Sequence, residues 1–193
     1  MGKGRIEAFS DGVLAIVITI MVLELMVPLG AGFDDLRPML PNLLSYALSF
    51  IYVGIYWSNH HHLFHAVKSV RGPILWANLH LLFWLSLTPL TTAWMGEHPT
   101  ATAPVALYGA DLLMNAVAYT ILVMALLRHE GPDSILARAI GRDFKGWASL
   151  ALYATAIPLA FFAPPVSIGI YVAVALIWLI PDRRIERAMM AVS

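Results

Sequence analysis

The sequence predicts an all-α protein that is embedded in a membrane and crosses it several times. Hydrophobic residues make up 60% of the 193-residue chain, whereas charged residues make up only 12%. The mean hydropathy is +0.75, and long apolar runs recur along the chain between short polar segments. A soluble domain of this length is less apolar and more highly charged. These observations exclude a soluble domain and favour a bundle of transmembrane helices.

A membrane-spanning helix needs about 20 mostly apolar residues, and the chain contains six candidate stretches. They lie at 6–28, 39–65, 73–95, 103–128, 146–163 and 165–181. The last two are short and are separated by Pro164 and Pro165, which predicts a tight helical hairpin that bends at the membrane face. Because no long linker divides the spans, we expect one transmembrane domain over residues 1–182 and a short basic tail over residues 183–193.

The basic residues are distributed unevenly between the loops. Of the 12 Lys and Arg residues, only Arg37 lies on the side opposite to the others. The positive-inside rule therefore places both termini and the 66–72 and 129–145 loops in the cytoplasm of a cell-membrane protein. The tail is interpreted as a basic stop after the last span, with a short amphipathic helix on the membrane surface as the alternative. The formal net charge of zero gives no indication of a nucleic-acid partner.

The first span carries polar groups that are costly inside a membrane. Arg5, Ser10 and Asp11 lie near its cytoplasmic end, where they either anchor the helix or belong to a functional hydrogen-bonded cluster. At about 100° per residue, five other positions fall within about 80° of one another. These positions form one stripe: Gly12, Ile16, Thr19, Leu23 and Met26. Such a stripe indicates either helix packing or the lining of a pore.

Polar residues also occur in later spans. The motif NHHHLFH places His61 and His65 one helical turn apart, a spacing that suits a metal ion. Only carboxylates are available to complete a site, since the chain contains no cysteine. We therefore expect hydrogen-bonding or titratable histidines, no metal and no catalytic set. Asp111 is a second intramembrane carboxylate, which a transporter would use as an ion site and a channel would bury against Asn115 or a neighbouring helix.

Three motifs resemble those of one family of membrane proteins. Arg5-x-x-x-Phe9-Ser10-Asp11 opens the first span, YWSNHHHLFHAV closes the second, and WANLHLLFWLSLTPLTT lies in the third. Together they resemble the transmembrane protein 175 family, and specifically its single-repeat prokaryotic members. The Arg-x-x-x-Phe-Ser-Asp motif is the specific part. The resemblance covers at least the first three spans, whereas the last three match only as hydrophobic segments.

This resemblance implies a potassium-permeable, weakly to moderately selective cation channel that passes ions passively and lacks the usual TVGYG filter. It also implies a homotetramer in which four copies of the first span line a central pore. An apolar ring shortly after the signature motif narrows the pore in this family and corresponds to Ile16, and positions farther along the same face correspond to Thr19 and Leu23. We therefore expect constrictions at Ile16 and Leu23, a pore lining that includes Gly12, Thr19 and Met26, and selectivity at Thr19. The structural alternative for Thr19 is a bond back to the carbonyl of residue 15.

The resemblance also gives the signature residues a structural role. Arg5, Phe9, Ser10 and Asp11 would connect the cytoplasmic ends of the first three helices, which is valuable in lipid because no water satisfies an unpaired carboxylate there. The candidate partners at the same level are Trp57, His60, His61 and Asn78.

A passive channel has one main alternative, a secondary transporter or a proton-permeable pathway that uses the intramembrane carboxylates. A transporter favours internal repeats and helices broken at mid-membrane, which the sequence does not show. The expected partners are other copies of the chain, the lipid bilayer and permeant K⁺, with no cofactor.

Overall fold

The computed structural model describes residues 3–67, 69–141 and 143–179, and all regular elements in these ranges are helical. In chain order they are α1 (Lys3–Leu23), the 3-10 helix η1 (Phe33–Met39), α2 (Leu40–His65), α3 (Gly72–Glu97), α4 (Thr102–Glu130), α5 (Ile135–Ile140), α6 (Phe144–Leu159) and α7 (Pro164–Leu179). The predicted all-α class is confirmed. The tail 183–193, with its two interpretations, lies outside the described residues.

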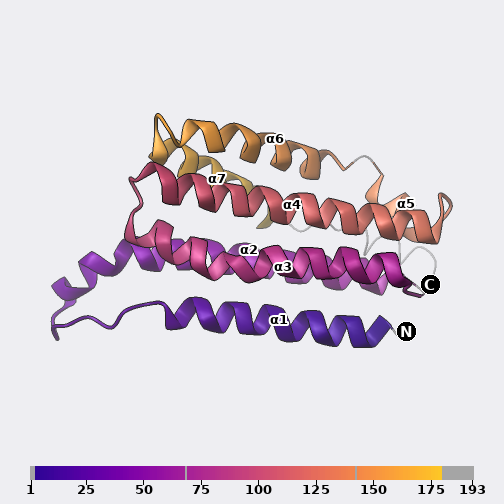
Figure 1. Cartoon of the computed structure of the whole chain (residues 1–193), viewed down its shortest axis with the longest axis horizontal. Helices are drawn as coiled ribbons and strands as arrows, with labels where there is room; N and C mark the ends of the chain where they lie inside the picture. The colour runs from indigo at the N-terminus through magenta and orange to yellow at the C-terminus, as the bar shows by residue number, and fades with distance from the viewer. Residues whose placement is uncertain (1–2, 68, 142, 180–193) are drawn as a thin grey trace.

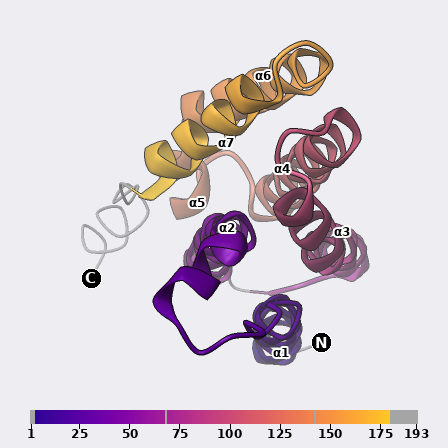
Figure 2. The same ribbon diagram turned by 90° about the vertical axis from the view of Figure 1, so that its left-hand side faces the viewer.

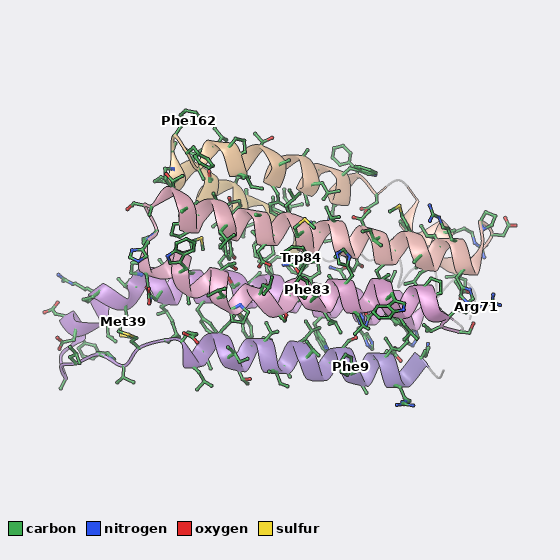
Figure 3. The ribbon with its side chains drawn as sticks, viewed as in Figure 1. Phe9, Met39, Arg71, Phe83, Trp84 and Phe162 are labelled. Carbon is green, nitrogen blue, oxygen red and sulfur yellow. The ribbon has the colours of Figure 1, made fainter. Side chains whose placement is uncertain are left out.

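The long helices form a bundle in which α1 lies at the edge. Helices α1 to α4 run along the long axis of the molecule (Figure 1). Seen along that axis, α1 lies beside α2 and α3, and the α6–α7 hairpin lies on the other side against α2 and α4 (Figure 2). Arg71 lies at one end of the bundle, and Met39 and Phe162 lie at the other (Figure 3). One side of α1 is therefore not covered by the rest of the chain.

Each predicted span overlaps one of the helices α1, α2, α3, α4, α6 and α7. Four segments are long and apolar enough to cross a membrane: Lys3–Leu23, Phe33–His65, Gly72–Glu97 and Thr102–Glu130. Helix α6 has 16 residues, or about 24 Å of helix, which is shorter than the roughly 30 Å hydrocarbon core. Helix α7 is described over Pro164–Leu179. The described residues therefore form a multi-pass membrane protein with four long helices and the α6–α7 hairpin.

The first helix ends earlier than the hydrophobic pattern predicts. The pattern gives a helix to residue 28, whereas α1 ends at Leu23. Pro28 supplies the physical reason, because its ring would clash with the carbonyl of Glu24 in a continuing helix and it has no N–H to donate. Met26 therefore lies in the following loop, and helical geometry does not place it on the predicted stripe.

Two further details differ from the sequence-based expectation. Pro164 and Pro165 begin α7 and do not form the bend, which consists of residues 160–163. Proline is favoured at the start of a helix because its missing N–H has no intrahelical partner there. The short elements η1 and α5 are not predicted from the hydrophobic pattern. In α5 the side chain of Ser134 caps the helix by accepting from the Ala137 N–H at 3.1 Å.

Two apolar clusters hold the bundle together. The first includes residues of all four helices α1, α2, α3 and α4, among them the buried side chains of Leu63, Phe64 and Leu81. The second joins α2, α3, α4, α6 and α7 around Tyr108 and Tyr171. Close packing in the second cluster depends on Gly109, since a Cβ atom there would overlap the hydroxyl of Tyr171. Helix α1 contributes only to the first cluster.

Candidate functional site

Helix α1 packs on the bundle through one face. Its buried residues recur every three or four positions, which is the spacing of one stripe on an α-helix. They are Ile6, Ser10, Leu14, Val17 and Met21. This face contacts α2 and α3. The position of α1 at the edge of the bundle therefore follows from a single apolar stripe.

The predicted pore stripe lies on the uncovered side of α1. Gly12, Ile16, Thr19 and Leu23 are all exposed in the single chain. The exposed fraction is 59% for Ile16 and 80% for Leu23. Large apolar side chains at this level of exposure require lipid or another protein surface around them. This face is therefore available to line a pore between several copies of the chain.

Thr19 carries the hydroxyl group of this stripe. Its Oγ1 donates to the backbone carbonyl of Ile16 at 2.9 Å, one residue later than the carbonyl named as the structural alternative. A hydroxyl has one hydrogen and two acceptor lone pairs. Because the hydrogen is used by the backbone, a lone pair remains to accept from, or coordinate, a group outside the helix.

The first turns of α1 meet α2 and α3 through polar side chains. The indole Nε1 of Trp57 donates to Oδ1 of Asp11 at 3.0 Å. The amide Nδ2 of Asn78 donates to Oγ of Ser10 at 3.0 Å, and its Oδ1 lies 2.8 Å from Nε2 of His60. The structure thus brings five of the predicted residues together, and we refer to them as the polar network.

The two parts of this network differ in burial. Ser10, His60 and Asn78 are at most 2% exposed, whereas Trp57 is 50% exposed. The orientation of the Asn78 amide determines whether Nε2 of His60 carries a hydrogen. Because Nδ2 donates to Ser10, Oδ1 accepts from His60, so that Nε2 of His60 carries a hydrogen. The His60 ring also stacks on Phe64, with 4.5 Å between ring centroids.

Three other predicted members lie at the edge of the polar network. Arg5 and Phe9 are exposed, and the exposed fraction of Phe9 is 56%. The ring of His61 is exposed and stacks on Trp57, with 6.4 Å between centroids. Within the described ranges no ion pair connects Arg5 to Asp11. In a single chain these three residues therefore lie on the surface around the network.

One contact of α1 is not predictable from the sequence pattern. Nζ of Lys3 lies 3.1 Å from the carbonyl oxygen of Phe64, 61 residues away, and also reaches the carbonyls of His65 and Val67. The last carbonyls of a helix lack intrahelical donors and carry partial negative charge. Lys3 therefore holds the start of α1 to the end of α2. In the sequence, the positive charge of Lys3 predicts only that this end of the helix lies in the cytoplasm. It does not predict the contact with the end of α2.

Several histidines contact other aromatic rings or accept hydrogen bonds. His61 and His65 have 6.1 Å between ring centroids, and Nε2 of His80 accepts from the indole N–H of Trp84 at 3.0 Å. In the part of the chain that the structure describes, His, Asp and Glu form no group of three that could hold a metal ion. Within the NHHHLFH motif, His60, Leu63 and Phe64 are buried, whereas His61 and His65 are exposed.

Fold and site together define a multi-pass helical membrane protein whose first helix packs on the bundle through apolar and polar contacts on one face and is exposed on the other. Residues 5–89 match the family described as "Endosomal/lysosomal potassium channel TMEM175". A potassium channel of Chryseobacterium sp. (strain P1-3) is 59% identical over 189 residues, which are 98% of each chain. The chain belongs to the TMEM175 family, which is a family of ion channels and not of enzymes.

The similarity extends to a solved structure and to animal relatives. The crystal structure of a lysosomal potassium-selective channel TMEM175 homolog from Chamaesiphon minutus matches with a TM-score of 0.78 and 29% identity, covering 93% of this chain and 97% of that one. The endosomal/lysosomal proton channel TMEM175 of Bos taurus is 30% identical over 179 residues, which are 83% of this chain but 37% of the bovine protein. The family resemblance seen in the three motifs is therefore confirmed, and it includes the helices without such motifs.

Proposed function

We propose that this protein is a potassium channel of the cell membrane that passes K⁺ passively through a pore between four copies of the chain. The observation that carries this proposal is the exposed apolar face of α1, opposite to the face that packs on α2 and α3. The name of the Chryseobacterium relative supports K⁺ as the permeant ion. In this arrangement α1, α2, α3, α4, α6 and α7 each cross the membrane, both termini are cytoplasmic, and α1 is innermost.

The proposed pore is narrowed by apolar rings. Four copies of Ile16 form the main constriction and four copies of Leu23 form a second one toward the outer end of α1. A ring of large aliphatic side chains closes a pore by dewetting, because a hydrated cation cannot cheaply shed its water into hydrocarbon. Gly12 lines a wider section on the cytoplasmic side, where the absence of a side chain leaves room.

The proposed assembly is tested by the mass of the purified protein. We expect a homotetramer in detergent, because a central pore lined by one helix per subunit needs several subunits. Native mass spectrometry or light scattering with detergent correction measures the subunit number. A monomer or dimer as the sole species in several mild detergents would contradict the assembly, and with it the role of α1.

The transport mode is tested in liposomes that contain the purified protein. We expect K⁺ to move down its gradient without a coupled ion, and we expect no dependence on a second substrate. The second candidate function is a proton-permeable pathway or a proton-coupled transporter, which the name of the bovine relative favours. A pH-sensitive dye inside the same liposomes separates the two, since obligatory proton movement with each K⁺ ion would exclude a passive potassium channel.

Selectivity is expected to depend on Thr19. Replacing Thr19 with valine keeps the shape and removes the hydroxyl oxygen, which would lie about 4.5 Å along the axis from Ile16. Four such oxygens offer coordination to a partly dehydrated cation, and the hydrogen bond to the Ile16 carbonyl leaves their lone pairs available. We expect the K⁺/Na⁺ permeability ratio, measured from reversal potentials, to fall several-fold. An unchanged ratio with intact tetramers would return Thr19 to a structural role.

A further inference from the structure

A carboxylate lies buried in the bundle, away from the exposed face of α1. Asp111 on α4 is 4% exposed. Its Oδ2 accepts from the hydroxyls of Thr88 and Thr91 on α3, at 3.0 and 3.2 Å. Its Oδ1 is buried and has no hydrogen-bond partner. Thr91 shares its single hydroxyl hydrogen between this Oδ2 and the backbone carbonyl of Thr88, which lies 3.2 Å from the Thr91 Oγ1. Oδ2 of Asp111 therefore has hydrogen-bond donors, whereas Oδ1 has none.

A second unsatisfied oxygen lies one helical turn away. Asn115 is 1% exposed, and its Nδ2 donates to the backbone carbonyl of Asp111 at 2.9 Å. Because a carbonyl only accepts, this contact fixes the orientation of the amide. The Oδ1 atom of Asn115 is then an acceptor, and it too is buried without a donor. Among the described residues, these two oxygens are the fully buried side-chain polar atoms without a partner.

The surroundings supply no charge that would balance an ionised Asp111. No ion pair in the described ranges includes this residue. The titratable side chains that face it are Tyr56 on α2 and Tyr108 on α4, and the hydroxyl of Tyr108 is paired with Ser49 at 2.9 Å. Burial of an unpaired charge costs far more than burial of a hydrogen-bonded neutral group. Each unsatisfied buried acceptor adds the full desolvation cost of that group.

We propose that Asp111 is a proton-binding site: the carboxyl group is held as the neutral acid, and its Oδ1–H donates to Oδ1 of Asn115. A single hydrogen then serves both unsatisfied oxygens, while Oδ2 continues to accept from Thr88 and Thr91. Residues four apart on a helix lie on the same face, so the two side chains are neighbours on α4, and Nδ2 of Asn115 already contacts the backbone of Asp111. The site holds α3 to α4 and does not depend on the permeant ion of the pore.

Infrared spectroscopy of the full-length protein in liposomes tests the proposal. We expect a carboxylic-acid C=O stretching band at neutral pH that is absent in Asp111→Asn. In this variant the amide N–H₂ group replaces the O–H donor of the acid, and the amide oxygen replaces Oδ2 as the acceptor for the threonine hydroxyls. Glu24→Gln is the matched control, because Glu24 is exposed and its replacement is expected to leave the band unchanged. Asn115→Leu removes the acceptor and is expected to shift the band without removing it, so the test does not depend on one variant.

Two results would overturn the proposal. One is a wild-type spectrum at neutral pH in which no acid band differs from that of Asp111→Asn. The other is a band that appears only when K⁺ and Na⁺ are replaced by a bulky organic cation, which would mean that an ionised Asp111 binds a small metal cation.

The pH dependence of stability gives a second readout. Above the ordinary titration range of aspartate, the unfolded chain has released the proton of Asp111, whereas the folded protein of this proposal still holds it. The folded state therefore binds more protons than the unfolded state in that pH range. Stability then decreases as pH rises. We expect the melting temperature of the wild type to decline between mildly acidic and alkaline pH more steeply than that of Asp111→Asn. Equal slopes in the two proteins would contradict the proposal.

Discussion

Replacement of Ile16 with asparagine is expected to raise the K⁺ current about tenfold, which corresponds to lowering the barrier by ~1.4 kcal/mol. Ile16 is 59% exposed on the uncovered face of α1. In the proposed tetramer its four copies form the dewetted constriction, and an amide in each position gives water and the ion hydrogen-bonding groups at that level. Currents recorded from a planar bilayer with known protein content provide the measurement.

The control for this variant is Val22→Asn. Val22 is also apolar and exposed, with an exposed fraction of 44%, but six residues at about 100° each place it about 120° around α1 from Ile16. We expect this substitution to leave the current close to that of the wild type. If Ile16→Asn conducts like the parent and Leu23→Asn opens the pore, the main gate lies one ring farther out than proposed.

The largest effect on stability is expected from Asn78→Leu. Asn78 is 2% exposed and pairs with both Ser10 and His60. A leucine of similar size leaves these two buried groups without partners, at about 1–3 kcal/mol each. We therefore expect a loss of ~2–6 kcal/mol, seen as a lower melting temperature and as dissociation in size-exclusion chromatography. The loosened α1 is also expected to reduce the open-state current.

Two variants show whether burial determines this cost. Asn59→Leu removes an amide that donates to the carbonyl of Ile55 in its own helix, so it tests the same chemical change without a contact to α1. Asp11→Ala removes the acceptor of the half-exposed Trp57 indole, and we expect a smaller loss of about 0.5–1.5 kcal/mol. An Asn78→Leu protein that melts like Asn59→Leu would show that the polar network does not hold α1 in place.

The family and the exposed stripe could be predicted because they depend on local sequence. The Arg-x-x-x-Phe-Ser-Asp motif lies within seven consecutive residues at positions 5–11. The stripe of Gly12, Ile16 and Leu23 follows from the 3.6-residue period of one helix. The helical class itself follows from the length and hydropathy of each apolar run, since a chain in lipid must satisfy its backbone hydrogen bonds within each span.

Contacts between helices were decided by the tertiary structure. Trp57 reaches Asp11 across 46 residues and Asn78 reaches Ser10 across 68, and such pairings depend on how rigid helices pack. The sequence identified Trp57, His60 and His61 as candidate partners of the signature residues but did not separate the buried His60 from the exposed His61. Likewise, Asp111 was recognisable as an intramembrane carboxylate. Only the packing of α3 on α4 showed that two threonines serve one of its oxygens and leave the other without a donor.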